Sequence, residues 1–170
     1  MTMLGAITLD GRGAADRLLM GLAQRLTASG ARLCGAVQEN RERAGRDKPD
    51  MVLHMLPDMA ECPITQDLGA LSGGCTLDVT ALETAAALAE SRLHGADLVI
   101  INKFGKREVE GRGFRDLVGN ALGAKIPVLV AINPAVRPAF AAYAGDMVTW
   151  LPADENILYD WSNALLTRVK

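Results

Sequence analysis

The sequence predicts an α/β domain in which a mainly parallel sheet is covered by helices on both faces. Short apolar runs alternate along the chain with segments of helical periodicity, and this alternation is typical of βαβ units. The apolar runs at 96–101 (ADLVII) and 126–132 (IPVLVAI) are continuous, as in strands buried on both faces of a parallel sheet. The length of 170 residues fits one domain spanning 1–170, so we expect a single three-layer sandwich.

The first part of the chain predicts a strand, a glycine-bearing turn and a helix. The apolar run at 4–9 ends at the turn 10–13, and the following segment repeats apolar residues with helical spacing up to Gly30. A second buried strand is predicted at 32–37, followed by a polar, solvated and mobile loop at 38–50.

The middle of the chain predicts a short β-hairpin insertion and then a helix. Two apolar runs, MVLHML and CPIT, flank the turn at 57–60. After the loop 66–75, either Asp78 or Thr80 can cap a helix that runs from Val79 to about His94.

The last part continues the alternation of strands and helices. A basic loop at 102–113 follows the strand 96–101 and precedes a helix at 114–122. The remaining predicted elements are the strand 126–132, a helix at 134–145, a short strand at 147–151 and a C-terminal amphipathic helix.

Composition excludes several classes of partner. The net charge of −2 argues against a general nucleic-acid footprint or a polybasic membrane surface, and no apolar run approaches the ~20 residues of a membrane span. The N-terminus lacks a signal-peptide pattern, so we expect a cytoplasmic protein. Cys34, Cys62 and Cys75 are predicted to be reduced thiols, and with His54 and His94 they form no zinc signature.

The turn after the first strand occupies the position of a phosphate-binding loop. Its free amides and the positive end of the helix dipole favour an anion. A phosphate loop would place Gly-Lys-Ser/Thr where this chain has Ala14, Ala15 and Asp16, so the lysine for the phosphates and the hydroxyl for magnesium are missing. We assign the anion-binding role to Asp10, Gly11, Arg12, Gly13 and Ala14; a plain strand–helix connection is the alternative.

The strand 96–101 ends in a second altered signature. P-loop enzymes carry an Asp for magnesium here, often followed by a Glu that activates water. This chain has Asn102 and Lys103. An amide lacks the charge that a hard cation prefers, and the lysine offers a cation to a bare oxyanion or, alternatively, merely extends into solvent. Lys106 and Arg112 in the same basic loop also belong to the predicted ligand set.

A further ligand-facing element is predicted around the loop 66–75. Gln66, Asp67, Gly74 and Cys75 precede a helix, and glycines let backbone amides approach an anion closely. The alternative is a tight turn with a buried thiol.

These segments together resemble the thermostable nucleoside-triphosphatase family of small P-loop proteins. The counterparts are LDGRGAAD at 9–16, Cys34-Gly35-Ala36-Val37-Gln38, the hairpin 51–65 and Asn102-Lys103-Phe104-Gly105-Lys106-Arg107-Glu108. This resemblance implies a P-loop NTPase-like fold, although the two catalytic signatures are the segments that depart from the family.

The chain also resembles the bacterial family called domain of unknown function 2478. The segments that carry this resemblance are QDLG at 66–69, GCTLD at 74–78, INKFGK at 101–106 and EGRGF at 110–114. Genes of that family often lie beside molybdate-transport genes, which implies a role in molybdenum handling.

The resulting hypothesis is a non-hydrolysing anion-binding protein on a degenerate P-loop fold, with no catalytic residue and no metal ligand. Molybdate, tungstate or a nucleotide is the expected ligand, and a homo-oligomer or a molybdenum-handling partner is left open. Two alternatives remain: a nucleoside triphosphatase or nucleotide-binding protein with an atypical basic site, and a protein-interaction scaffold.

Overall fold

The computed structural model describes residues 2–67 and 76–167. Its strands are β1 (Leu4–Ile7), β2 (Leu33–Arg41), β3 (Asp50–Met55), β4 (Ala60–Pro63), β5 (Leu98–Phe104), β6 (Val128–Ile132) and β7 (Val148–Trp150). Its α-helices are α1 (Ala14–Ala28), α2 (Val79–Ser91), α3 (Lys106–Val109), α4 (Arg115–Gly123), α5 (Arg137–Ala144) and α6 (Glu155–Leu166).

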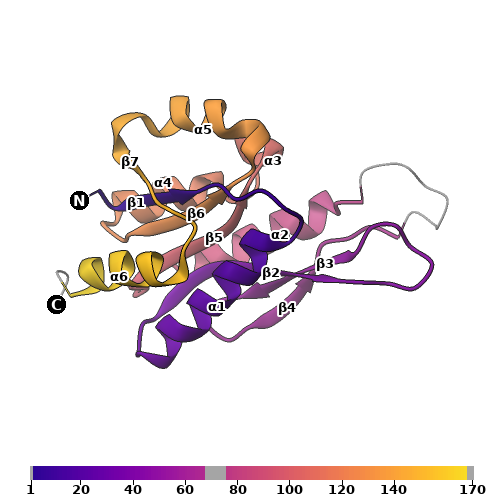
Figure 1. Cartoon of the computed structure of the whole chain (residues 1–170), viewed down its shortest axis with the longest axis horizontal. Coiled ribbons are helices and arrows are strands. Elements are labelled where there is room, and N and C mark those ends of the chain that lie inside the picture. The colour runs from indigo at the N-terminus through magenta and orange to yellow at the C-terminus, as the bar shows by residue number, and fades with distance from the viewer. Residues whose placement is uncertain (1, 68–75, 168–170) are drawn as a thin grey trace.

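The strands form one sheet in the order β4-β3-β2-β5-β6-β1-β7. The pairs β2–β5, β5–β6, β6–β1 and β1–β7 are parallel, whereas β2–β3 and β3–β4 are antiparallel. The predicted hairpin is therefore confirmed, and it continues the central sheet as its antiparallel end (Figure 1).

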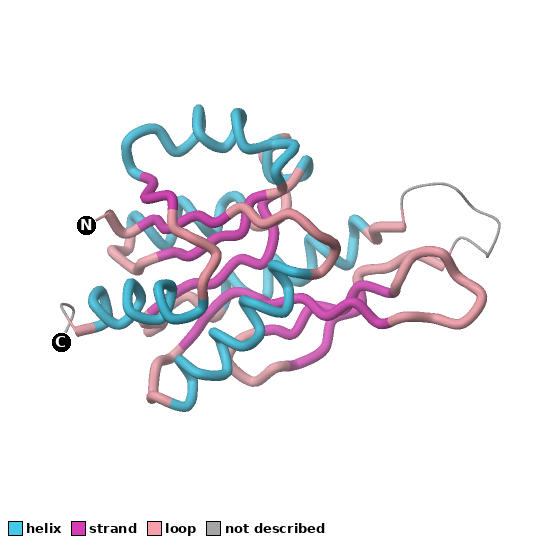
Figure 2. Tube along the Cα trace, in the orientation of Figure 1, coloured by secondary structure: helices cyan, strands magenta, loops and turns pink. Residues whose placement is uncertain are grey.

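Helices cover both faces of the sheet, as the alternation of the sequence predicts. One apolar cluster joins α1 and α6 to alternate strand residues such as Leu98 and Ile100. A second cluster joins α2, α4 and α5 to the intervening residues Val99 and Ile101. Figure 2 shows the strands between these two helical layers. The three-layer α/β sandwich is thus confirmed.

Several predicted boundaries move because polar residues join the sheet. β2 continues to Arg41, so 38–41 belong to a strand and the predicted solvated loop is wrong for these residues. β5 continues to Phe104, and α3 lies inside the segment predicted as a basic loop. Of the two proposed caps of α2, Asp78 caps it by accepting a hydrogen bond from the amide of Ala81 at 3.0 Å.

The close pairing of β2 with β5 depends on Gly35. This residue has a φ of +103°, and a Cβ at this position would lie 2.0 Å from the carbonyl oxygen of Ile100. A larger residue would force β2 away from β5.

The strand order brings three chain segments to one edge of the sheet. β6 lies between β1 and β5, and the three strands are parallel. The segments that follow β1 and β6 therefore meet the end of β5 at their carboxyl edge, where ligands bind in open α/β sheets.

Placing a charge in the centre of β5 should unfold the protein. Val99 is fully buried, so Val99→Asp should lower the free energy of unfolding by about 3–5 kcal/mol, because the buried carboxylate has no partner. The matched control is Leu88→Asp, since Leu88 on α2 is 37% exposed. Urea denaturation measures both; a Val99→Asp curve that matches the parent would contradict the buried position of β5.

Candidate functional site

A cavity of about 240 Å³ lies at the carboxyl edge of the sheet, beside the phosphate-loop-like turn. Three segments supply its walls: the turn between β1 and α1, the end of β5, and the segment that begins at the end of β6. The lining residues include Asp10, Gly11, Arg12, Gly13, Asp16, Asn102, Lys103 and Asn133. The structure therefore brings the turn and the altered end of β5 into one site.

The turn leaves the first amides of α1 without a side-chain cap. Gly13 is the N-cap residue in a left-handed conformation, with a φ of +73°. Among the described residues, no side chain accepts a hydrogen bond at this cap. The first N–H groups of an α-helix lack intrahelical partners. They form an electropositive helix end beside the cavity.

Asp16, in the first turn of α1, is held by a closed network of side-chain amides. Asn102 donates to one carboxylate oxygen at 2.5 Å, and Asn40 donates to the other at 2.6 Å. The backbone N–H of Gln38 donates to Asn102 Oδ1 at 2.8 Å, and its side-chain amide donates to Asn40 Oδ1 at 2.8 Å. The network ties α1 to β2 and β5, and it uses both carboxylate oxygens of Asp16.

The last residues of β5 point in opposite directions, as successive side chains of a strand do. The β5–β6 pairing also shifts register between Ile101 and Phe104. Asn102 is 4% exposed and joins the network, whereas Lys103 is exposed at the cavity.

Asp16 and Asn102 contact each other directly. The sequence comparison puts these two residues at the positions of the magnesium-binding hydroxyl and the magnesium-binding Asp. One carboxylate and one neutral amide, already bonded to each other, give a hard cation little to bind. In the described part of the chain, no group of three or more His, Cys, Asp or Glu side chains is arranged to hold a metal ion.

The formal side-chain charges around this cavity balance. Arg12 and Lys103 are opposed by Asp10 and Asp16, so the remaining attraction for an anion must come from the electropositive end of α1. The two amide donors on Asp16 disperse its negative charge.

A second cavity of about 330 Å³ adjoins the first on the side of the hairpin. Lys103 lines both cavities, as do Asn102 and Asn133. The predicted ligand residue Lys106 lines the second cavity, together with Arg107 of α3 and Lys48 of the β2–β3 connection.

Glu108 is a buried carboxyl group in the wall of the second cavity. It is 4% exposed, and it accepts hydrogen bonds from the amides of Gly105 at 3.0 Å and Phe114 at 3.3 Å. Burial raises the pKa of Glu108 above its usual value, against the opposing effect of these amides. Its role in positioning the 105–114 segment was not predicted from the sequence.

Other predicted ligand residues lie outside the two cavities. Arg112 is exposed and contributes to neither cavity wall. The side-chain amide of Gln66 donates a hydrogen bond to the backbone carbonyl of Leu77 at 2.6 Å. This bond links the described residues that precede 68–75 to those that follow. Asp67 pairs with Arg46 at 2.7 Å. Gly74 and Cys75 fall outside the described residues.

The two described cysteines are free thiols. Burial raises the pKa of Cys34 to about 11, which makes its thiolate scarce near neutral pH. No helix in the described part of the chain has the length and apolar character required to cross a membrane.

Comparisons with known proteins place this site in a family context. The model of the family described as "Protein of unknown function (DUF2478)" matches residues 4–161. A segment of Molybdenum import ATP-binding protein ModC 2 of Bradyrhizobium diazoefficiens is 34% identical over 156 residues, which cover 91% of this chain but 17% of that protein. The crystal structure of THEP1 from Aquifex aeolicus has a TM-score of 0.63 at 17% identity, covering 98% of this chain and 96% of the other. This last likeness confirms the predicted P-loop NTPase-like fold.

Restoring an acid at the end of β5 should destabilise the site in a pH-dependent way. Asn102→Asp removes the donor to Asp16 and faces it with a second carboxylate, so the pKa of the pair is raised. The free energy of unfolding should fall by roughly 1–3 kcal/mol at neutral pH. This loss should shrink as the pH falls below the raised pKa, because a proton then joins the carboxylates.

The control for this change is Asn133→Asp, which adds the same charge to the same cavities. Asn133 uses its side-chain oxygen to accept from the amide of Ala135, an interaction that a carboxylate keeps. Urea denaturation between pH 5 and 8 compares the two variants. If the two variants lose the same unfolding free energy at every pH, the contact between Asn102 and Asp16 has no specific stabilising role.

Proposed function

This chain belongs to the DUF2478 family, and we propose that it binds a small oxyanion without hydrolysing a nucleotide. The ligand site is the cavity between the phosphate-loop-like turn and the end of β5. The proposal includes a role in the handling of molybdate or tungstate.

The observation that carries the proposal is the hydrogen bond between Asn102 and Asp16. Phosphoryl transfer depends on positioned cations that neutralise developing charge. Here the two segments that would hold magnesium contact each other directly, and the phosphate-loop lysine is missing. The site retains the geometry of an anion cradle but lacks the groups that stabilise the transition state of hydrolysis.

Binding of an anion is supported by the start of α1, which has no side-chain cap, and by Lys103. A helix N-terminus acts like roughly half a positive charge, and Lys103 adds a full charge from the end of β5. In a P-loop enzyme the acidic residue at this position would repel an anion unless a metal were present. Because Lys103 is a cation, an anion needs no metal ion to offset repulsion at this position.

The choice of molybdate or tungstate is supported by the similarity to a segment of Molybdenum import ATP-binding protein ModC 2. A segment related to this chain forms 17% of a protein named for molybdenum import and ATP binding. The present chain spans only that small share, so the link to molybdenum import is part of the proposal. It also motivates the proposed partner, a protein that transports or stores the same anion.

Calorimetry with molybdate, tungstate and phosphate tests the proposal. We expect binding of molybdate and tungstate that weakens as salt rises, because the charges at the cavity are partly exposed. Lys103→Glu should weaken binding by about tenfold or more, since it replaces attraction by repulsion.

The matched control is Lys125→Glu, because Lys125 is exposed in the connection between α4 and β6 and lines neither cavity. Lys48 is unsuitable as a control, since it lines the second cavity. Failure of all three anions to bind, or equal effects of the two lysine changes, would overturn the proposed function.

A further inference from the structure

We infer that the second cavity holds the ring body of an organic anion, whose phosphate or similar tetrahedral group lies at Lys103. This inference deepens the proposed function and rests on it for the position of the anionic group. It assigns a ligand class to a cavity that the binding of a bare oxyanion leaves unused.

The inner surface of the second cavity is apolar. Its side chains come from β2, β3, the residue after β4, the start of α2 and the residue before α4. They are Ala36, Met51, Leu53, Ile64, Leu77, Leu82 and Phe114. Leu53, Ile64 and Phe114 are buried members of the apolar cluster on this face of the sheet. Such a surface gains free energy by removing a hydrocarbon ring from water.

Cations from three separate segments line the same cavity. Lys48 comes from the β2–β3 connection, Lys103 from the end of β5, and Lys106 and Arg107 from α3. The carboxyl group that shares this lining is Glu108, whose oxygens are engaged by the amides of Gly105 and Phe114. The cavity therefore combines an apolar interior with an excess of positive charge, which fits a ligand with one apolar and one anionic part.

The two cavities adjoin at the residues that they share. Asn102, Lys103 and Asn133 line both, so an anion held at Lys103 lies next to the apolar interior. The volume of about 330 Å³ is within the range of small-molecule sites, about 300–1,000 Å³. A tetrahedral ion occupies the polar end only and leaves this apolar surface to water.

Arg107 lines the second cavity while part of its guanidinium group is enclosed by the protein. Its Nε atom is buried and has no hydrogen-bond partner among the described residues, while its Nη1 atom lies 3.4 Å from Glu110. Buried donors in proteins are normally bonded.

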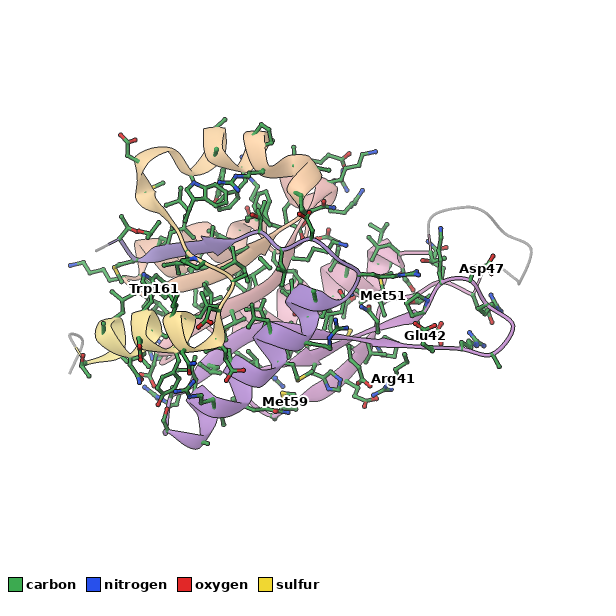
Figure 3. All side chains as sticks on the ribbon, viewed as in Figure 1. Arg41, Glu42, Asp47, Met51, Met59 and Trp161 are labelled. Carbon is green, nitrogen blue, oxygen red and sulfur yellow. The ribbon has the colours of Figure 1, made fainter. Side chains whose placement is uncertain are left out.

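Met51 is suited to test the inference because it lies at the boundary between the apolar interior and the charged connection. It is half-buried on β3, and Figure 3 shows it closer to the body of the sheet than Asp47 of the β2–β3 connection. Met147 provides a matched control, since it is 56% exposed and lines neither cavity.

The experiment compares 1-naphthyl phosphate with inorganic phosphate by calorimetry on the whole protein. Naphthyl phosphate should bind at least about tenfold more tightly, because its ring leaves water. Met51→Gln should weaken the binding of naphthyl phosphate by about three- to tenfold and leave the affinity for inorganic phosphate unchanged. Met147→Gln should change neither affinity. In the parent protein, naphthyl phosphate should shift the NMR signal of the Met51 methyl group and not that of Met147.

The possible results separate this inference from the proposed function. Equal affinities for the two phosphates would overturn the inference and leave oxyanion binding intact. Tighter binding of naphthyl phosphate without any effect at Met51 would also overturn it, because the ring would then lie elsewhere. If neither phosphate compound binds, and molybdate and tungstate do not bind either, the inference and the proposed function are both overturned.

Discussion

The hydrogen bond between Asn102 and Asp16 is the interaction on which the rest of the site depends. It joins the first turn of α1 to the end of β5, the two places that P-loop enzymes connect through magnesium and phosphate. Asn40 and Gln38 close the network from β2. The protein's own side chains thus link these two segments directly, which is the observation behind the proposal that the site works without a metal.

The same part of β5 also sets the position of the exposed cation Lys103. Successive side chains of a strand point to opposite faces, so Asn102 is buried in the network while Lys103 is exposed toward the two adjoining cavities. Gly35 keeps β2 close to β5, so that Gln38 reaches Asn102. The arrangement of three strands therefore determines both the neutral link and the position of the cation beside it.

Much of the fold could be predicted from the sequence, because buried parallel strands and amphipathic helices have strong periodic signals. The boundaries of β2 and β5 could not, since Gln38, Asn102 and Lys103 are polar residues that the sheet accommodates through side-chain pairing. The sequence identified the altered phosphate-loop turn and Lys103 as one site, and the structure brings them together. It gave no sign that Asp16 bonds to Asn102, although the alternation of Gln38 and Asn40 on one face of a strand could have indicated a polar partner. The second cavity is formed by residues distant in sequence and has no local motif.

Phosphate release from ATP and GTP, measured with magnesium and again with a chelator, tests the central claim most directly. The account predicts no stimulation by magnesium, because Asp16 and Asn102 already satisfy each other and neither the phosphate-loop lysine nor the acidic pair is present. Magnesium-dependent multiple turnover that Lys103→Ala abolishes would contradict the account, since it would show that this site binds a metal–nucleotide complex and catalyses its hydrolysis.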